Sequence, residues 1–375
     1  MDFSLSDTQL EVQGLVRKIL QEQADDAHLK ELEQAGENFD RPLWSLLAES
    51  GLLGLALDEA QGGAALGFET LCLLAEECGR RAAPLPVVPC LAGAALTLHL
   101  SDNEEQRQRW LPAVATGSTL LTVANLEPSG AGLRTPTTQL AAGALHGRKH
   151  CVAYAEYAER ILVSALDGDE LLLAWVDPAA PGASLEAQLC TTREPQSRLT
   201  LDGYPLQEQE ILARGQQAQC LAMECEQRQM AALCAFATGM TDTMMRMTAS
   251  YTSEREQFGR KIATFQAVGQ RAADCYIDVE CLRLVSQQAI SLIDRGQDAA
   301  AAAAVAKIWC GDILHRVSQA SQHLHGGTGV DRDYPLHRYC LLARQLELTL
   351  GSSAQLTQEL GQRIAAERLE KLLQE

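Results

Sequence analysis

Tyr251-Thr-Ser-Glu-Arg-Glu-Gln-Phe-Gly-Arg-Lys-Ile-Ala-Thr-Phe-Gln266 is a short glycine-containing stretch between two long helical patterns. The planar guanidinium of Arg255 is suited to a pyrophosphate, because it can give paired, charge-assisted hydrogen bonds. Phe258 can pack on a heterocycle, and the amide of Gln266 can donate or accept at a ring edge. By itself the stretch is also compatible with a purely structural helix–loop–helix turn.

Helical patterns surround this stretch on both sides. The segment Leu221–Thr252 contains no proline and one glycine, which predicts a long helix. A second helix is expected from Phe265 to about Asp294, and a third over 299–310, where an alanine run indicates tight helix packing. A fourth is expected after Tyr334-Pro335, because proline at a first helical position needs no N–H partner.

The earlier part of the chain divides into a helical region and a region of strands. Helices are expected at Pro42–Ser50, Phe68–Arg81 and Glu104–Leu111. Short apolar runs bounded by Gly, Pro and Asp predict strands at Leu120–Ala124, Ile161–Ala165 and Leu171–Val176. We therefore expect a helical domain over 1–118, a β domain over 119–213 and a helical bundle domain over 214–375.

Composition excludes several classes of function. The chain has 375 residues, 46% hydrophobic residues and a formal net charge of -18. Nucleic acids and anionic membranes need basic surfaces, so neither is an expected partner. Twelve cysteines without Cys-x-x-Cys spacing indicate free thiols, a reducing and therefore cytoplasmic location, and no metal site. No signal peptide or membrane-spanning run is recognisable.

Two further motifs support a specific family resemblance. They are Leu43-Trp-Ser-Leu-Leu-Ala-Glu-Ser-Gly-Leu-Leu-Gly-Leu55, followed by Asp58-Glu-Ala-Gln-Gly-Gly63, and Gln322-His-Leu-His-Gly-Gly-Thr-Gly-Val-Asp-Arg-Asp-Tyr-Pro335. With the stretch Tyr251–Gln266, they occur in the order found in flavin-dependent acyl-CoA dehydrogenases, and the chain resembles that family over essentially its whole length. The resemblance implies a mainly α fold: an N-terminal helical domain, a β-barrel-like middle domain and a C-terminal four-helix bundle.

The resemblance also implies the cofactor and its contacts. Members of the family use FAD to remove two hydrogens from the α and β carbons of an acyl-CoA thioester, and pass electrons to electron-transferring flavoprotein. Residues of the bundle domain reach across a subunit interface to a neighbour's FAD. In this chain the matching positions are Arg255, Phe258, Gln266, His323, Gly326 and Gly327.

The catalytic carboxylate of the family has no counterpart here. A carboxylate must take the weakly acidic α proton, and desolvation must raise its pKa for that task. The commonest position of this base is occupied by Leu350, and the alternative positions on the preceding long helix fall at Gln229 and Phe236. We therefore predict no catalytic residue in this chain. Glu226 and Glu347, each three residues from such a position, remain the alternative bases.

The segments of the middle domain that bind flavin in the family are altered as well. Asn125-Leu-Glu-Pro128 has Leu126 where a threonine is usual. Gly147-Arg-Lys-His-Cys-Val-Ala153 has Cys151 and Ala153 where the family has tryptophan and threonine. Two hydroxyl groups and a large aromatic surface are thereby lost, although main-chain N–H groups could still contact a flavin.

These departures lead to a hypothesis with alternatives. The chain is predicted to be the subunit of an α2β2 acyl-CoA dehydrogenase that completes the FAD site of a homologous catalytic subunit, in lipid or steroid catabolism by β-oxidation. One alternative is a homotetrameric dehydrogenase that uses Glu226 or Glu347 as its base. Others are a flavoprotein of this fold with different chemistry, such as an oxidase or a damage-response protein, and an interaction scaffold without a cofactor.

Overall fold

The computed structural model describes residues 3–374, and the side chains of residues 3–366. The chain divides into two compact units. The bundle unit consists of Met1–Ser6, Ala75–Ala82 and Met230–Glu375, and the sheet unit of Asp7–Leu74 and Ala83–Gln229.

The sheet unit begins with helices. Asp25 caps the second of them by accepting a hydrogen bond from the His28 N–H, and Gly36 ends it in the left-handed conformation with φ 75°. Asp40 caps the third, which has proline in its first turn. The helices up to the first strand are α1 (Asp7–Gln23), α2 (Asp26–Ala35), α3 (Arg41–Glu49), α4 (Gly67–Arg81), α5 (Leu96–His99) and α6 (Glu104–Ala115), with short helical turns η1 (Leu52–Gly54) and η2 (Glu59–Gln61) and the π-helix η3 (Val87–Ala95).

The strands form one eight-stranded sheet. Its order is β6-β7-β3-β2-β4-β5-β8, and β1 pairs with β4 in parallel. The strands are β1 (Leu121–Val123), β2 (Gln139–Ala141), β3 (Ala144–Ala153), β4 (Arg160–Asp167), β5 (Glu170–Val176), β6 (Ala183–Gln188), β7 (Gln196–Pro205) and β8 (Ile211–Arg214), with turns η4 (Ala155–Tyr157) and η5 (Glu208–Glu210). Asp167 pairs with Glu170 across a two-residue turn in which Gly168 has φ 62°, the conformation that tight hairpin turns require.

Buried aliphatic side chains hold the sheet together. β4 and β5 each carry a nearly continuous buried run, in agreement with the apolar patterns of their sequences. The core on one face of the sheet includes Ile161, Val163, Leu172 and Val176, all at most 1% exposed. At about 1.5–3 kcal/mol for each fully buried aliphatic side chain, such a layer strongly favours the folded sheet.

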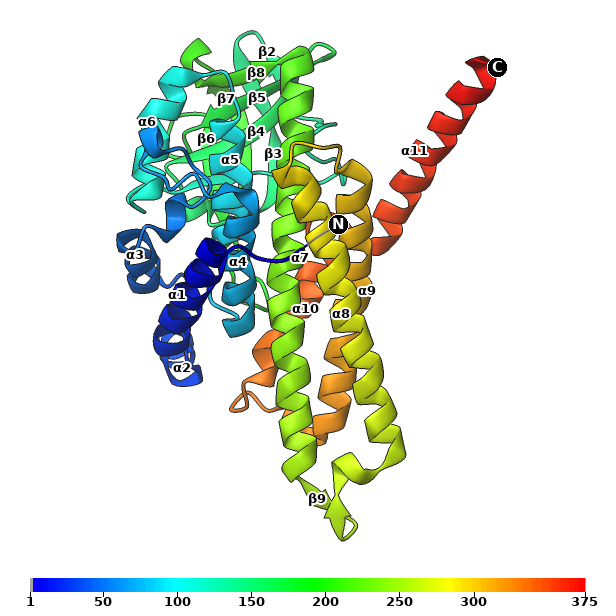
Figure 1. The fold of residues 1–375 in the computed structure, drawn as a ribbon. Coiled ribbons are helices and arrows are strands. Elements are labelled where there is room, and N and C mark those ends of the chain that lie inside the picture. Colours follow the sequence, from blue (N-terminus) through cyan, green and yellow to red (C-terminus); the bar gives the residue numbers. More distant parts are fainter. Residues whose placement is uncertain (1–2, 375) are drawn as a thin grey trace. The chain divides into compact units, whose positions relative to one another are not determined.

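The bundle unit is built from long helices (Figure 1). They are α7 (Gly215–Glu254, of which residues 230–254 belong to this unit), α8 (Gln266–Asp294), α9 (Ala300–His325), α10 (Leu336–Leu348) and α11 (Ser353–Gln374), with the strands β9 (Glu256–Gln257) and β10 (Arg260–Lys261) and the turns η6 (Ile262–Thr264) and η7 (Gly326–Val330). Helices before the sheet, a middle sheet and helices after it confirm the predicted class of fold. The division at residues 118 and 213 stays a prediction.

Two glycines allow α4 and α7 to touch within the bundle unit. A Cβ added to Gly79 would lie 1.9 Å from the carbonyl oxygen of Phe236, and one added to Gly239 would lie 1.9 Å from that of Glu76. Any side chain at either position would therefore separate the two helices. Phe236, one of the family's alternative base positions, is 9% exposed in this crossing.

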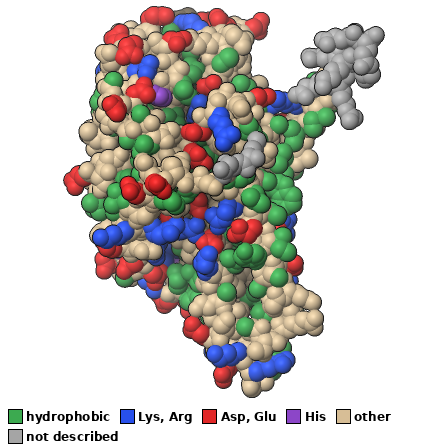
Figure 2. Space-filling model, in the orientation of Figure 1, with side chains coloured by type: hydrophobic (Ala, Val, Ile, Leu, Met, Phe, Trp, Pro, Cys, Tyr) green, Lys and Arg blue, Asp and Glu red, His purple; other side chains and the backbone are tan. Residues whose placement is uncertain are grey.

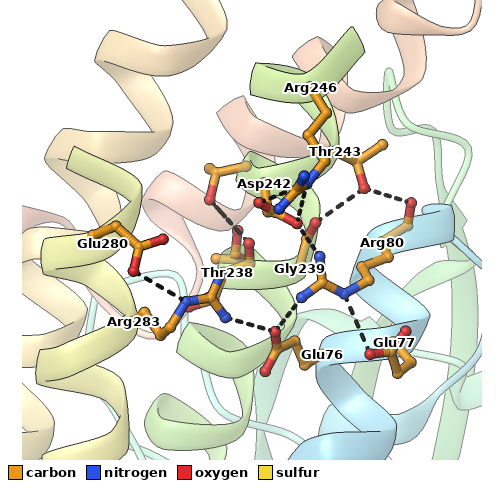
Figure 3. Close-up of polar contacts among 12 residues, drawn as sticks. Glu76, Glu77, Arg80, Thr238, Gly239, Asp242, Thr243, Arg246, Glu280 and Arg283 are labelled. Atoms are coloured by element: carbon orange, nitrogen blue, oxygen red, sulfur yellow. Dashed lines mark hydrogen bonds and ion pairs between the residues drawn. The ribbon is translucent and has the colours of Figure 1, made fainter. Parts of the chain in front are cut away.

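A network of ion pairs fastens the same crossing (Figure 3). Arg80 donates to Glu76 at 2.6 Å and to Asp242, and Arg283 of α8 donates to Glu76 at 2.9 Å. Although burial raises it, hydrogen bonds from Arg246 and Arg80 lower the pKa of Asp242 overall. The network joins α4, α7 and α8 and satisfies carboxylates that would be costly to bury alone.

Several boundaries differ from those predicted. α6 continues through Pro112 to Ala115 instead of ending at Leu111. Pro335 is the N-cap of α10 and not its first residue. Among the described helices, none is both long and apolar enough to cross a membrane.

Candidate functional site

The stretch between α7 and α8 is a two-stranded hairpin. Gln257 pairs with Arg260, so Phe258 and Gly259 form the turn, with φ of 56° and 75°. Two positive φ values are typical of the tight turn that matches the twist of a hairpin. An aromatic residue is uncommon in this conformation. Phe258 is nevertheless 90% exposed, so packing within the chain does not account for it.

Cationic and aromatic side chains alternate around this turn. The guanidinium of Arg260 lies 3.9 Å from the ring centroid of Phe265, which itself lies 6.1 Å from the ring of Phe258 in an edge-to-face arrangement. Contacts of this kind are worth about 0.5–1 kcal/mol at an exposed site. They orient the hairpin while its outer aromatic face remains open to a ligand.

The ends of three helices meet beside the hairpin. Tyr251, near the end of α7, stacks on His325 at the end of α9, with ring centroids 4.3 Å apart. Arg271, in the second turn of α8, donates to His323 of α9 at 2.6 Å. Figure 1 shows the hairpin at the end of the bundle where α7 and α9 end and α8 begins. The six predicted residues belong to these segments and to the turn after α9: Arg255, Phe258, Gln266, His323, Gly326 and Gly327.

The glycine pair after α9 leaves its backbone accessible. Gly326 ends the helix with φ 61°, a conformation that glycine adopts without strain. No atom lies within 4 Å of a Cβ added to Gly326 or Gly327, and both residues are exposed. A ligand can therefore approach the main chain closely at this point.

This end of the bundle fits part of a dinucleotide. Arg255, Arg260 and Lys261 are exposed cations in a chain of net charge -18, and Figure 2 shows Lys or Arg side chains gathered where the hairpin lies. Guanidinium groups, an imidazole and open glycine backbone are suited to the oxygens of a pyrophosphate. The exposed ring of Phe258 is suited to a heterocycle.

The residue at the family's commonest base position, Leu350, lies in a loop with a strained backbone. Leu350 lies between α10 and α11 with φ 60°, and Gly351 follows with φ 98°. The buried ammonium of Lys307 donates to the carbonyl oxygens of Glu347 and Gly351, at 3.2 and 3.0 Å, and so closes the loop. The backbone is held firmly, but the leucine side chain cannot accept a proton.

Gln229, the first alternative base position, is taken up by a pair of amides. Its side chain donates to Asn125 at 3.1 Å and accepts from it at 2.8 Å. Gln229 is 1% exposed, and a Cβ added to Gly93 would lie 3.0 Å from its amide carbon. The site is therefore filled by a neutral, doubly hydrogen-bonded side chain.

Both fallback carboxylates are held in ion pairs. Glu226 accepts from the Nε of Arg134 at 2.6 Å. Glu347 accepts from Arg344 at 2.9 Å and lies 3.4 Å from His315. Each carboxylate thus has a positioned cationic partner, and neither lies in the apolar surroundings that prepare a general base.

The middle-domain segments have closed their hydrogen bonds internally. The His150 N–H donates to the Leu126 carbonyl at 2.8 Å, and the Cys151 N–H donates to the Gln188 side chain at 2.8 Å. The Glu127 N–H donates to the carbonyl of Ala131. The sequence left open whether these main-chain groups could contact a flavin, and the structure shows these three donors already paired.

A buried ion pair stabilises these segments. Lys149 donates to Glu127 at 2.5 Å and to the Ser164 carbonyl at 2.8 Å, and both charged side chains are 1% exposed. Burial by itself would raise the pKa of Glu127, but Lys149 and two threonine hydrogen bonds lower it to about 2. The pair holds the loop and offers no free proton acceptor.

Two contacts of the candidate site were not predicted from the sequence. Arg271 was missed because it lies five residues beyond the recognised motif, and its partner His323 is 52 residues away. The Asn125–Gln229 pair spans 104 residues. For the contact between Arg271 and His323, the sequence offered one signal, a cation in the early turns of the helix that follows the hairpin. Within the described residues, no group of three or more His, Cys, Asp or Glu side chains could hold a metal ion.

Comparisons with known proteins agree with this geometry. The chain matches the family description "Acyl-CoA dehydrogenase, N-terminal domain" over residues 6–118 and "Acyl-CoA dehydrogenase, C-terminal domain" over residues 221–365. It is 32% identical to acyl-CoA dehydrogenase FadE27 of Mycobacterium tuberculosis, over 97% of this chain and 99% of that protein.

Two solved structures are similar over nearly the full length. One is described as the steroid ACAD Tcur3481-Tcur3483, with a TM-score of 0.89 and 40% identity over 98% of this chain and 100% of that one. The other is the ChsE4-ChsE5 complex from Mycobacterium tuberculosis, with a TM-score of 0.91 and 31% identity over 97% of this chain and 99% of that one. The chain therefore belongs to the acyl-CoA dehydrogenase family of FAD-dependent oxidoreductases.

Proposed function

We propose that this chain is the non-catalytic subunit of an α2β2 acyl-CoA dehydrogenase and completes the FAD site of a homologous catalytic subunit. The observation that carries this proposal is the Asn125–Gln229 pair, because it fills an alternative base position with two neutral amides. Leu350 and Phe236 occupy the other two positions and cannot accept a proton. The chain has kept the fold of the family without an obvious base.

The hairpin end of the bundle supports the second half of the proposal. Arg255 would bind the pyrophosphate of the neighbour's FAD, Phe258 would pack on a ring of it, and Gln266 would hydrogen-bond a ring edge. His323 and the open backbone of Gly326-Gly327 would contact the remaining polar atoms. When bound, FAD supplies the acceptor for the hydride from the β carbon, and these residues only bind and orient it.

An exposed apolar face also supports association with another subunit. On α8, Tyr276, Ile277 and Leu284 are 57%, 57% and 55% exposed. Ile277 and Leu284 are seven residues apart and therefore lie on one side of the helix. Apolar side chains grouped in this way are characteristic of protein interfaces.

The partners follow from the family and from the relatives. ChsE4-ChsE5 is described as a complex, and Tcur3481-Tcur3483 as a steroid ACAD. We therefore propose a homologous dehydrogenase subunit as the permanent partner, an acyl-CoA thioester with a bulky or ring-bearing acyl group as the substrate, and electron-transferring flavoprotein as the acceptor. All twelve cysteines are free thiols, in keeping with a cytoplasmic location.

Co-expression with a neighbouring dehydrogenase gene tests the proposal. The chain purified alone is expected to hold little flavin and to oxidise no acyl-CoA. The co-purified complex is expected to be yellow, with about two flavins per four chains, because only the two catalytic subunits of the proposed α2β2 assembly hold FAD. If the chain alone binds one flavin per chain and reduces it with an acyl-CoA, the proposal is wrong.

Matched variants then identify the alternative. In a homotetrameric enzyme, Glu226→Gln or Glu347→Gln abolishes flavin reduction, and Glu224→Gln serves as the control on the same helix as Glu226. In the α2β2 complex, none of the three changes the rate of flavin reduction. Flavin binding without any reaction with acyl-CoA would indicate a flavoprotein with different chemistry.

A further inference from the structure

The contact between Arg271 and His323 joins two helices at the predicted flavin-binding end. The Nη1 of Arg271, on α8, lies 2.6 Å from the Nδ1 of His323, on the last turn of α9. Both side chains are exposed, so the contact is not forced by core packing. His323 stands three residues before Gly326, whose backbone is open to a ligand.

This contact determines which ring nitrogen of His323 carries the proton. A guanidinium has only donors and stays protonated in proteins. The Nδ1 of His323 must therefore offer its lone pair, and the single proton of the neutral ring lies on Nε2. The opposite tautomer would place two N–H groups against each other at 2.6 Å.

We propose that Arg271 is a positioning residue that fixes His323 as a hydrogen-bond donor, through Nε2–H, toward the FAD of the neighbouring subunit. The inference rests on the proposed function and assigns a role to a residue outside the recognised motifs. Arg271 acts through His323, and the dinucleotide is contacted by the imidazole.

The chemistry of the ligand explains why a donor is needed. The oxygens of a pyrophosphate and the unsubstituted ring nitrogens of an adenine are acceptors. A neutral imidazole has one donor nitrogen and one acceptor nitrogen. Unless a second partner occupies the acceptor nitrogen, that nitrogen can face the ligand, where it forms no hydrogen bond. A glutamine at this position would carry donor and acceptor on one amide and could turn to present the donor.

A double-mutant cycle separates positioning from direct binding. FAD dissociation constants are measured by reconstituting the flavin-free co-expressed complex. Arg271→Met is expected to weaken FAD binding about fivefold to tenfold, the loss of one modest hydrogen bond. In a His323→Gln background the same change is expected to alter binding less than about twofold, because the amide needs no fixed tautomer.

The outcome of the cycle and two further variants show whether the inference holds. An equal loss in both backgrounds would show that Arg271 contacts the dinucleotide directly, and no loss in either would show that the contact has no role; both overturn the inference. Arg295→Met, at the exposed far end of the same helix, is the control that should bind FAD normally. If Arg255→Ala also leaves FAD binding unchanged, the proposed function itself is wrong.

A measurement without FAD checks the tautomer directly. Nitrogen-15 spectra of the histidine-labelled chain, with His323→Gln used to identify the signal, should show His323 protonated at Nε2. In Arg271→Met the signal should shift toward a mixture of both tautomers. A mixture in the unaltered chain, or the same tautomer in both proteins, would overturn the inference whatever the FAD measurements show.

Discussion

The middle-domain segments and the hairpin end of the bundle match the two parts of the chain that contact flavin in the family, and they differ in how their polar groups are satisfied. Around Leu126 and Cys151, main-chain donors are paired within the chain. At the hairpin, Arg255 and the backbone of Gly326-Gly327 are exposed. Buried main-chain donors need a partner within the chain, whereas exposed groups such as those at the hairpin end are free to meet a ligand or another subunit, as the proposed function requires.

The largest effect is expected where the middle-domain segments hold themselves together. Lys149→Met leaves the buried carboxylate of Glu127 without its cation, which should lower the free energy of unfolding by about 3–5 kcal/mol. Chemical denaturation followed by circular dichroism measures the loss. Arg255→Met, an exposed change at the hairpin, should stay within about 0.5 kcal/mol. Similar losses in the free energy of unfolding for both variants would contradict the difference between the two regions.

The next largest effect concerns the ligand and not the stability. Arg255→Ala in the co-expressed complex removes a charge-assisted contact worth about 1.5–3 kcal/mol, so FAD should bind roughly 10- to 150-fold more weakly. Flavin fluorescence during titration of the flavin-free complex measures this. His150→Ala, a change in the middle-domain segments of the same chain, should leave the affinity unchanged, because that region meets no flavin in the proposed complex. The reverse ranking of the two variants would contradict the proposal.

A smaller effect tests whether the amide pair is a unit. Gln229→Ala leaves the Asn125 amide without its partner and should cost about 1–3 kcal/mol. The double change with Asn125→Ala should cost clearly less than the sum of the two single changes, since the residues act through each other. Gln219→Ala, on the exposed side of the same helix, is the control. Strict additivity would mean that the pair is not coupled.

Mild acid, down to about pH 4.5, should have the smallest effect, and only stronger acid should remove the contribution of Glu127. The folded pKa of Glu127, about 2, lies below its ordinary value of 4.5. Its stabilisation is therefore complete above about pH 4.5 and is lost as the pH falls toward 2. The difference in stability between the unaltered chain and Glu127→Gln should therefore shrink as the pH falls from about 4.5 toward 2. A difference that begins to shrink above pH 5 would point to another titrating group.

Local patterns predicted much of the fold. The helix α8 and the strands β4 and β5 were expected within two residues of their observed ends, and α7 begins six residues before the expected start. Long apolar patterns specify such elements. The strands β2, β3, β6, β7 and β8 were not expected, since their alternating or mixed patterns are weak. The π-helix at Val87–Ala95 was also missed, because a continuous apolar run does not reveal its helical type.

The sequence predicted which residues form the candidate site, but not their backbone conformations or their side-chain partners. Arg255, Phe258 and Gln266 were recognisable from one motif, and His323, Gly326 and Gly327 from another. Nothing in either motif showed that Phe258 adopts φ 56°, or that Arg271 is the partner of His323.

The amino-acid sequence alone determined the family, the succession of a helical, a strand-containing and a helical region, and the absence of an acid at Leu350, Gln229 and Phe236, because these depend on residue identity and short-range spacing. The tertiary structure decided which polar groups are hydrogen-bonded within the chain and which remain exposed to a ligand. Pairs such as Asn125–Gln229 and Arg271–His323 join residues 104 and 52 positions apart, so they exist only once the helices and the sheet have packed.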